Sequence, residues 1–376
     1  METSIPLALK YRPKKLADVV GQDIIVRILT NSFKSKNWHH AYILEGLRGS
    51  GKTTTSRIMA AMENCEKGPT LEPCGKCRSC QEIFSGKSQD IKEIDAASKR
   101  SIEDVRAMQE DILTCPIYNK IKYVIIDEAH GWTGYAADAA LKMIEEPPPH
   151  VRFILCTTQP ESFKATIPSR CITLNFKKID WREIQNHLNN VCKMEDIQAD
   201  ASAVKLIARS SGGSIRDSLQ NLQTVIDYAG GDTLNEEMVQ KVLGAISDDV
   251  YFSFIQAMID VNAPEVMKIA NKLLASGGNV SKVVDGLIAY IRNIQLYLTS
   301  KDQIISEWLS ADEIKKIAHN AQYLKPSLTY IMLNYIRDEL KRGILVNMPA
   351  DAALESFAIG IMMEMVKRKK AETKGD

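Results

Sequence analysis

Residues 46–53 form a glycine-rich segment whose residue types and spacing suit phosphate binding. The segment fits the pattern G-x4-G-K-[ST] and reads Gly46, Leu47, Arg48, Gly49, Ser50, Gly51, Lys52 and Thr53. Thr54, the next residue, is also expected to bind the nucleotide. Glycines let backbone N–H groups wrap a phosphate, while Lys52 suits the terminal phosphates and the Thr53 hydroxyl suits Mg²⁺. An ordinary strand–helix turn is the alternative. The flanking AYILE and TTTSRIMAAM supply the strand and helix that a phosphate loop needs.

Two acids, Asp127 and Glu128, follow the apolar run YVII. An acid at the C-terminal end of a parallel strand faces the crevice where nucleotides bind. We expect Asp127 to hold Mg²⁺ and Glu128 to orient and deprotonate a water, which would make the chemistry hydrolysis. Two solvated acids after a core strand are the alternative. His130 follows closely, and we assign it no role.

Four of the eight cysteines cluster within a short stretch, as Cys65, Cys74, Cys77 and Cys80. Four thiolates in a local loop suit a closed, tetrahedral structural Zn²⁺ site. A redox C-x-x-C pair, which leaves two cysteines unexplained, and an iron–sulfur cluster stay open as alternatives. The other four have apolar neighbours and are expected to be buried: Cys115, Cys156, Cys171 and Cys192.

Several further polar residues could have a function only if the fold brings them to the same site. Thr158 follows a predicted strand and could bond the attacking water or a γ-phosphate, and Arg216 opens a predicted helix that could fold back onto a nucleotide. Arg170 precedes another strand and is expected to point outward. Lys99 and Arg100 begin a helix where phosphates of DNA could bind. A surface salt bridge or a solvated helix start is the alternative for these residues.

The elements that would position these residues alternate in the first half of the chain. Strands are predicted over 41–45, 91–95, 122–127, 151–157 and 171–176. Helices are predicted over 53–63, 102–113 and 136–145. This alternation is typical of a parallel sheet covered by helices. After Phe176 the pattern becomes helical, beginning with segments over 181–192, 201–209 and 215–228.

The fold class predicted is therefore α/β plus all-α, with three domains. They are a P-loop ATPase domain over 1–178 containing a zinc module near 64–82, a helical lid over 179–234 and a helical domain over 235–370. The last domain shows a broad apolar face from Val283 to Leu298. A polar tail over 371–376 is expected to fray.

Composition excludes several classes of protein. The chain has 376 residues, 45% hydrophobic and 25% charged, with 48 basic and 47 acidic side chains, which does not fit a disordered chain or a wholly basic nucleic-acid coat. No stretch has the roughly 18 uncharged residues that a membrane helix needs. The N-terminus has no secretory pattern, so we expect a cytoplasmic protein without a membrane partner.

Taken together, the motifs resemble the AAA+ clamp-loader ATPases, and closely the gamma/tau subunits of bacterial DNA polymerase III. The resemblance covers nearly the whole chain. It is carried by the following segments: LKYRPKKLADVVGQ at 9–22, GLRGSGKTTTSR at 46–57, the four-cysteine insert, EIDAASKRSIEDVR at 93–106, YVIIDEAH at 123–130, ALKMIEEPP at 140–148, FILCTTQPESFKATIPSRC at 153–171 and GGSIRDSLQ at 212–220.

The resemblance implies roles that the bare sequence could not assign. Thr158 aligns with the first sensor of the γ-phosphate and Arg216 with the second sensor in the lid. Arg170 aligns with an arginine finger that acts on ATP in the neighbouring subunit. Tyr11, Arg12 and Val20 fall where the family packs the adenine.

The family implies ATP, Mg²⁺ and Zn²⁺ as cofactors, and a C-terminal collar that assembles a ring. Its partners would be delta, delta-prime and further gamma/tau subunits, the sliding clamp and primer–template DNA. Three rival interpretations stay open: a structural paralogue that binds nucleotide poorly, a branch-migration motor, and a non-enzymatic zinc module that binds DNA. The intact phosphate loop, the SRC triplet at 169–171 and the acids at 127–128 respectively disfavour them.

Overall fold

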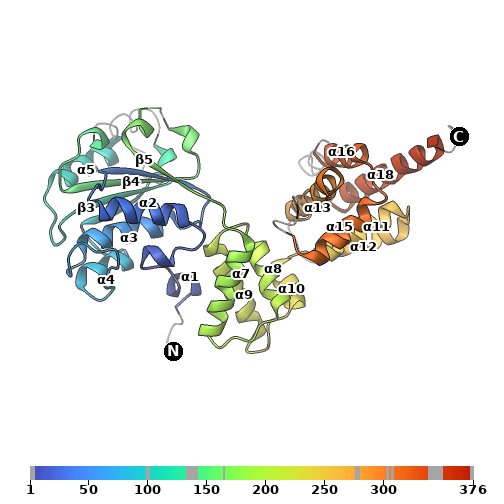
Figure 1. The fold of residues 1–376 in the computed structure, drawn as a ribbon, viewed down its shortest axis with the longest axis horizontal. Coiled ribbons are helices and arrows are strands. Elements are labelled where there is room, and N and C mark those ends of the chain that lie inside the picture. Colours follow the sequence, from blue (N-terminus) through green and yellow to red (C-terminus); the bar gives the residue numbers. More distant parts are fainter. Residues whose placement is uncertain are drawn as a thin grey trace. The chain divides into compact units, whose positions relative to one another are not determined.

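The computed structural model of the chain describes residues 5–98, 102–132, 143–163, 166–275, 280–301, 305, 309–337 and 350–372. The chain divides into two compact units, Met1–Thr233 and Leu234–Asp376 (Figure 1). Each unit has its own hydrophobic core and is described by itself.

The first unit is built on a five-stranded parallel sheet. The strands are β1 (Ala41–Gly46), β2 (Ile91–Asp95), β3 (Lys122–Asp127), β4 (Val151–Thr157) and β5 (Ile172–Phe176). Their order is β2-β3-β4-β1-β5, and every neighbouring pair is parallel. The predicted α/β class of this part is confirmed, and strand bounds differ from expectation by at most one residue.

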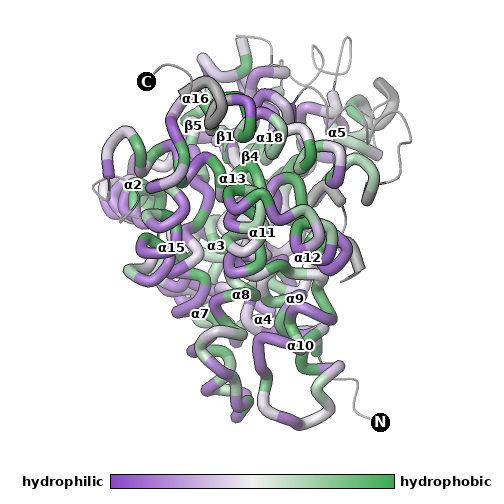
Figure 2. Tube along the Cα trace, turned by 90° about the vertical axis from the view of Figure 1, so that its right-hand side faces the viewer, coloured by the Kyte–Doolittle hydropathy of each residue, from purple (hydrophilic) through white to green (hydrophobic). Residues whose placement is uncertain are grey.

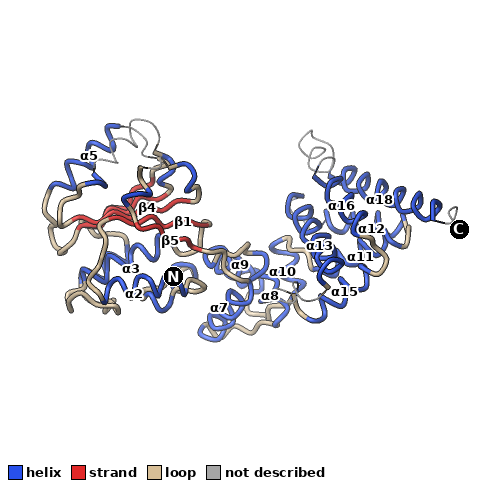
Figure 3. The backbone as a smooth tube through the Cα atoms, turned by 45° about the horizontal axis from the view of Figure 1, so that its top comes forward, coloured by secondary structure: helices blue, strands red, loops and turns tan. Residues whose placement is uncertain are grey.

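Helices cover both faces of this sheet (Figure 3). One face packs against α2 (Asp23–Lys34) and α3 (Lys52–Asn64), and the other against α5 (Ile102–Leu113). The interior strand β3 is therefore buried on both sides, which explains why its sequence is a continuous apolar run instead of an alternating one. All carboxyl ends of the strands meet at one edge, where loops can gather functional side chains.

Some elements of this unit differ from the sequence-based prediction. The helices α1 (Leu7–Lys10), α2 and α4 (Arg78–Ser85) were not predicted. The helix predicted over 136–145 lies largely outside the described residues. Cys156 and Cys192 are buried as expected, but the expectation for Cys115 is wrong because its side chain is exposed in the loop after α5. Cys171 is only half-buried.

Three further helices complete the first unit: α7 (Trp181–Met194), α8 (Ala201–Ser210) and α9 (Ile215–Ala229). Side chains cap two of them at the N-terminus. Asp180 accepts a hydrogen bond from the N–H of Arg182, and Ser214 accepts one from the N–H of Asp217. Each cap satisfies a backbone donor that has no partner within its helix.

The second unit is helical in its described part. Its longer helices are α10 (Glu236–Leu243), α11 (Asp248–Ile259), α12 (Ala263–Ala275), α13 (Val280–Ser300), α15 (Ala311–Ala321), α16 (Pro326–Tyr335) and α18 (Ala350–Glu372). The predicted apolar face of α13 is largely buried in the core of this unit, with Leu298 partly buried at its end. The helix α18 extends to Glu372, two residues into the tail predicted over 371–376, and the last four residues lie outside the described part of the chain.

Hydrophobic and hydrophilic residues are interspersed along the helices (Figure 2). Within the described ranges, no single helix is both long and apolar enough to cross a membrane. Only α10 and α11 taken together pass that test, and they are bent by 81° relative to each other.

A buried carboxylate, that of Asp90, organises the loop that leads into β3. It accepts hydrogen bonds from the N–H groups of Ile117, Tyr118 and Asn119 at 2.7, 2.9 and 2.8 Å. Burial by itself would raise the pKa of Asp90. The three N–H groups and the ammonium of Lys122 outweigh burial, so the pKa lies below its ordinary value.

We predict that Asp90→Asn lowers the free energy of unfolding of the first unit by about 1–3 kcal/mol at pH 7, because backbone donors lose a charged acceptor. A lowered pKa stabilises the fold above the unfolded value of about 3.9, and this stabilisation is lost as the pH falls through the folded value. The difference from wild type, measured by thermal unfolding, should therefore shrink below about pH 4. The control variant Asp232→Asn, at an exposed position, should change the free energy of unfolding little. An equal difference at pH 7 and pH 3 would contradict this account.

Candidate active site

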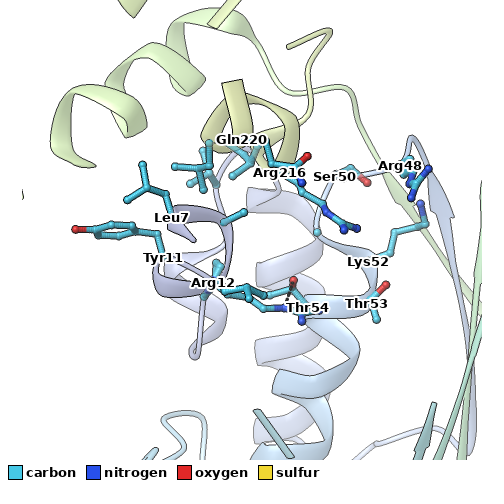
Figure 4. A pocket seen from close by; sticks show the side chains of 18 of the residues that line it. Leu7, Tyr11, Arg12, Arg48, Ser50, Lys52, Thr53, Thr54, Arg216 and Gln220 are labelled. Atoms are coloured by element: carbon cyan, nitrogen blue, oxygen red, sulfur yellow. Dashed lines mark hydrogen bonds between the residues drawn. The ribbon is translucent and has the colours of Figure 1, made fainter. Parts of the chain in front are cut away.

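A cavity of about 940 Å³ opens in the first unit at the carboxyl edge of the sheet. It is lined by the loop after β1, by residues at the ends of β2 and β3, by the N-terminal segment around α1, and by the helices α7 and α9 (Figure 4). The predicted site residues among its lining are Tyr11, Arg12, Val20, Arg48, Gly49, Ser50, Gly51, Lys52, Thr53, Thr54, Asp127, Glu128 and Arg216. Gly46, Leu47, Thr158 and Arg170 are not among the lining residues.

The loop between β1 and α3 depends on glycine at two positions. Gly51 has φ 106°, in the left-handed region that favours glycine, and α3 begins immediately after it. At Gly49, a Cβ atom would lie 2.0 Å from Oγ of Ser214, at the start of α9. Gly51 therefore allows the turn into α3, and Gly49 allows the loop to approach the start of α9 closely.

Lys52 and Thr53 begin α3 and lie at the floor of the loop. The buried ammonium of Lys52 donates to the carbonyl oxygens of Gly46 and Leu47 at 2.8 and 2.9 Å. Burial lowers the pKa of Lys52, although the nearby acids oppose that effect. The hydroxyl of Thr53 donates to Oδ2 of Asp127 at 3.0 Å. Hydroxyl and carboxylate oxygens are ligands that Mg²⁺ accepts, so this donor pair fits the cation.

Glu128 lies directly after β3 in an unusual backbone conformation, with φ 48°. Its Oε2 accepts a hydrogen bond from the hydroxyl of Thr158 at 3.1 Å and lies 3.4 Å from Nδ1 of His130. The same imidazole nitrogen lies 3.2 Å from the hydroxyl oxygen of Thr157. His130, to which the sequence assigned no role, thus shares with Thr158 the contacts that orient Glu128. Its position two residues after the acid was the only available signal.

Arginine side chains reach the cavity from two sides. Arg216, at the start of α9, extends toward the loop (Figure 4). The Nε of Arg12 donates to the hydroxyl of Thr54 at 3.0 Å. Burial, together with the charges of Arg57 and Arg216, lowers the pKa of Arg12 to about 10, so it remains charged at neutral pH. The positive charges of Arg216 on α9 and of Arg12 in the N-terminal segment therefore face the cavity.

The N-terminal segment connects α3 to the helix α7. Tyr11, next to Arg12, donates its phenolic proton to Glu195 at the C-terminal end of α7, and Nζ of Lys10 lies 2.6 Å from the same carboxylate. The hydrogen bond to Glu195, burial and the charge of Glu195 raise the pKa of Tyr11 to about 12. The phenol therefore stays protonated and remains a donor across the neutral range.

Arg170 lies at the opposite edge of the sheet from the loop. It ends the short turn η4 (Pro168–Arg170) before β5, and its Nε contacts Oε1 of Glu145 at 2.8 Å. A five-residue strand at about 3.3 Å per residue separates the two edges by roughly 16 Å. Arg170 thus cannot reach the phosphate loop of its own chain. Its side chain is 39% exposed, consistent with the expected outward direction.

Sequence reasoning missed the wall of the cavity formed by helices. This wall is contributed by residues such as Leu7, Ile179, His187, Ile215, Leu219 and Gln220. Ile215, Leu219 and Gln220 lie within the segment GGSIRDSLQ, in which only Arg216 was assigned a role, whereas Leu7, Ile179 and His187 belong to no motif. Leu7 is more than 170 positions from the other five, so only tertiary packing brings these residues together. Lys99 and Arg100, predicted to contact DNA, lie outside the described residues.

The four clustered cysteines lie together away from this cavity. Their sulfur atoms are all within 4.8 Å of one another. The N–H groups of Cys77 and Cys80 point at the sulfur atoms of Cys74 and Cys77 at 3.3 and 3.4 Å. Hydrogen bonds from the N–H groups of Lys76 and Cys77 lower the pKa of Cys74 to about 6, which favours a thiolate. The donor set and its closeness fit a tetrahedral Zn²⁺ ion.

Comparisons with known proteins match three successive parts of the chain to described families. Residues 21–180 match "DNA polymerase III, delta subunit", and residues 183–231 match "DNA polymerase III clamp loader subunit, ATPase lid domain". Residues 234–341 match "DNA polymerase III subunits gamma and tau domain III".

Individual relatives agree with these matches. The gamma subunit of DNA polymerase III from Buchnera aphidicola (Acyrthosiphon pisum) is 33% identical over 89% of this chain and 93% of the relative. The tau subunit from Escherichia coli is 39% identical over 72% of this chain and 42% of the relative. The chain spans about half the length of several of these tau relatives. Among solved structures, the Thermotoga maritima RuvB branch migration motor aligns with TM-score 0.49 and 18% identity, over 68% of this chain and 80% of that one.

For the cysteine cluster we predict about one zinc ion per chain. Cys77→Ser should lower zinc content strongly, because it removes one of four ligands, and should reduce the thermal stability of the first unit. Nucleotide binding should largely persist, since none of the four cysteines lines the cavity. Elemental analysis and nucleotide titration of the same preparations measure both quantities, with Cys115→Ser as the control. Iron in place of zinc, or no metal in protein purified without chelator, would contradict the assignment.

Proposed function

The chain belongs to the gamma/tau family of bacterial DNA polymerase III subunits, and from this premise we propose that it is an ATP-hydrolysing clamp-loader subunit. It converts ATP and water to ADP and phosphate, and it couples ATP binding and hydrolysis to opening the sliding clamp and loading it on primer–template DNA. It acts in the cytoplasm as a component of the replicative DNA polymerase.

One observation carries this proposal. The hydroxyl of Thr53 and the carboxylate of Asp127 lie 3.0 Å apart at the start of α3, beside a carboxylate, Glu128, that two other side chains orient. A phosphate loop, a pair of oxygen ligands and a base at one edge of a sheet are the parts that phosphoryl transfer to water requires.

Each residue then has a distinct role. The N–H groups of the loop and the ammonium of Lys52 hold the β- and γ-phosphates. Thr53 and Asp127 would hold Mg²⁺, which would neutralise phosphate charge. Glu128 accepts a proton from the attacking water, and Thr158 fixes the carboxylate in position for that transfer. Arg216 supplies positive charge from the lid, and Tyr11, Arg12 and Val20 lie beside the base and sugar.

The partners in this proposal follow from the family and from the position of Arg170. Because Arg170 cannot reach its own loop, we assign it to the ATP of a neighbouring subunit. The neighbours would be delta, delta-prime or further gamma/tau copies, held together by the helical collar at 235–370. The sliding clamp and primer–template DNA are the substrates of the assembly, with Lys99 and Arg100 as candidate contacts to DNA phosphates.

The overall test is ATP hydrolysis by the chain assembled with its partner subunits, measured with and without the clamp and primed DNA. Hydrolysis should rise when both are present. A chain that binds ATP but never hydrolyses it in any assembly would instead be a structural paralogue.

We predict that Lys52→Ala and Glu128→Gln separate binding from hydrolysis. Lys52→Ala removes a charged donor to phosphate and should weaken ATP binding about 10–100-fold. Glu128→Gln cannot accept the proton from water, so it should keep ATP affinity and lower the hydrolysis rate about 10²–10⁴-fold. Equilibrium binding and single-turnover hydrolysis distinguish the two. Equal losses of ATP affinity would show that this division of roles is wrong.

For Arg170 we predict that Arg170→Ala leaves ATP binding to the same chain nearly unchanged and lowers hydrolysis in the assembly. Arginine fingers contribute about 10³–10⁵ in rate in other phosphoryl-transfer systems, which sets the scale. Arg27→Ala, an exposed arginine on α2, is the matched control.

Mixing Arg170→Ala chains with Lys52→Ala chains tests whether Arg170 acts between subunits. Some mixed interfaces pair an intact ATP site with an intact arginine, so hydrolysis should recover in part. Mixed assemblies of verified composition that show no recovery would mean that Arg170 does not act in trans.

A further inference from the structure

The guanidinium of Arg170 is held by contacts within its own chain. Its Nε lies 2.8 Å from Oε1 of Glu145. Its Nη1 donates to the carbonyl oxygen of Thr166 at 2.8 Å and to the hydroxyl oxygen of Ser169 at 3.1 Å. An unrestrained arginine side chain samples many rotamers and loses that freedom when it binds a partner. These three contacts remove part of the freedom before any partner is bound.

The remaining nitrogen of the guanidinium, Nη2, is left for another acceptor. Within the part of the chain that the structure describes, neither of its N–H groups has a hydrogen-bond partner. The five N–H donors of an arginine form a rigid planar fork, so contacts at Nε and Nη1 also fix the direction of Nη2. Arg170 therefore has an oriented guanidinium with two donors available, which suits the oxygen atoms of a phosphate.

The backbone on both sides of the ion pair is anchored in the core. Ile144, next to Glu145, is buried, and its carbonyl oxygen lies 3.1 Å from Nε2 of His40. Ile167, directly before the turn η4, is buried in the same hydrophobic cluster as Ile144. Since the side chains of Arg170 and Glu145 are 39% and 38% exposed, the ion pair itself adds little stability to the fold.

Glu145 differs from the other two partners because it belongs to a separate segment. Thr166 and Ser169 lie within four residues of Arg170 and move together with its turn. Glu145 ends the described helical segment 143–145 instead, so its carboxylate fixes the guanidinium relative to the rest of the sheet edge. A contact between two ionised groups is also stronger than one to a neutral oxygen.

We infer that Glu145 positions Arg170 for the ATP of the neighbouring subunit. This inference rests on the proposed function, in which Arg170 acts in trans. Glu145 touches no phosphate and acts only through Arg170: it holds Nε so that the donors of Nη2 stay available to the γ-phosphate of the neighbour. A misplacement of about 1 Å can cost about 10²-fold in rate, so the loss of this restraint should be visible in hydrolysis.

The first test measures ATP hydrolysis by the full chain assembled with its partner subunits, in the presence of clamp and primed DNA. Glu145→Ala should lower the rate about tenfold, less than Arg170→Ala does, and should leave equilibrium ATP binding unchanged. Glu145→Gln keeps an oxygen that accepts from Nε, so its rate should stay within about threefold of wild type. Glu146→Ala, at the exposed neighbouring position, is the control. Thermal unfolding should be the same for all these variants.

The second test asks in which chain Glu145 acts. In a mixture of Arg170→Ala and Lys52→Ala chains, the productive interface takes its ATP site from the former and its arginine from the latter. Adding Glu145→Ala to the Lys52→Ala chain should lower the recovered rate about tenfold. Adding it to the Arg170→Ala chain should change nothing, because that chain has no arginine to position.

Three results would overturn the inference. Unchanged hydrolysis by Glu145→Ala would show that the ion pair has no part in the reaction, and faster hydrolysis would show that it restrains Arg170 from reaching the neighbour. Equal losses from placing Glu145→Ala in either chain of the mixture would indicate a general effect on folding or assembly. Failure of the proposed function is distinguishable, because the mixture of Arg170→Ala and Lys52→Ala chains would then show no recovery even with Glu145 intact.

Discussion

Parallel pairing of the strands is the constraint on which the rest of the first unit depends. Because β1, β3 and β4 run in the same direction, the residues that follow them all emerge at one edge of the sheet. This edge brings Thr53, which follows β1, within 3.0 Å of Asp127, which ends β3. It also brings Thr158, which follows β4, to Glu128. A single antiparallel strand here would send its polar side chain to the other edge.

The same pairing explains why Arg170 lies where it does. It precedes β5, which is parallel to β1, so it lies at the amino edge while the loop lies at the carboxyl edge. A change of side-chain rotamer cannot move the Arg170 guanidinium by the length of a strand. If an arginine from a neighbouring chain completes the ATP site, as we propose, oligomerisation would have a catalytic consequence, because each interface would contain half of a site from each subunit.

The wall of the cavity made by helices depends on weaker and more local contacts. Gly49 allows the loop to approach Ser214, and the N-terminal segment reaches α7 through Glu195 and α9 through Gln223. Partly exposed ion pairs such as Lys10–Glu195 contribute little free energy individually. The lid is therefore held by several small interactions, and a bound nucleotide that contacts both the loop and α7 would add to them.

The sequence by itself determined the features whose signal is local. The glycines and Lys52 lie within seven residues, the apolar runs of β3 and β4 mark buried strands, and the four cysteines lie within 16 residues, so local spacing indicated their chemistry. Only the tertiary structure decided which distant residues complete the site. His187 and Leu7 carry no pattern and reach the cavity because helices pack there. Cys115 has apolar neighbours in sequence but lies exposed in a loop. Burial and proximity across long separations are set by packing, which a local pattern does not encode.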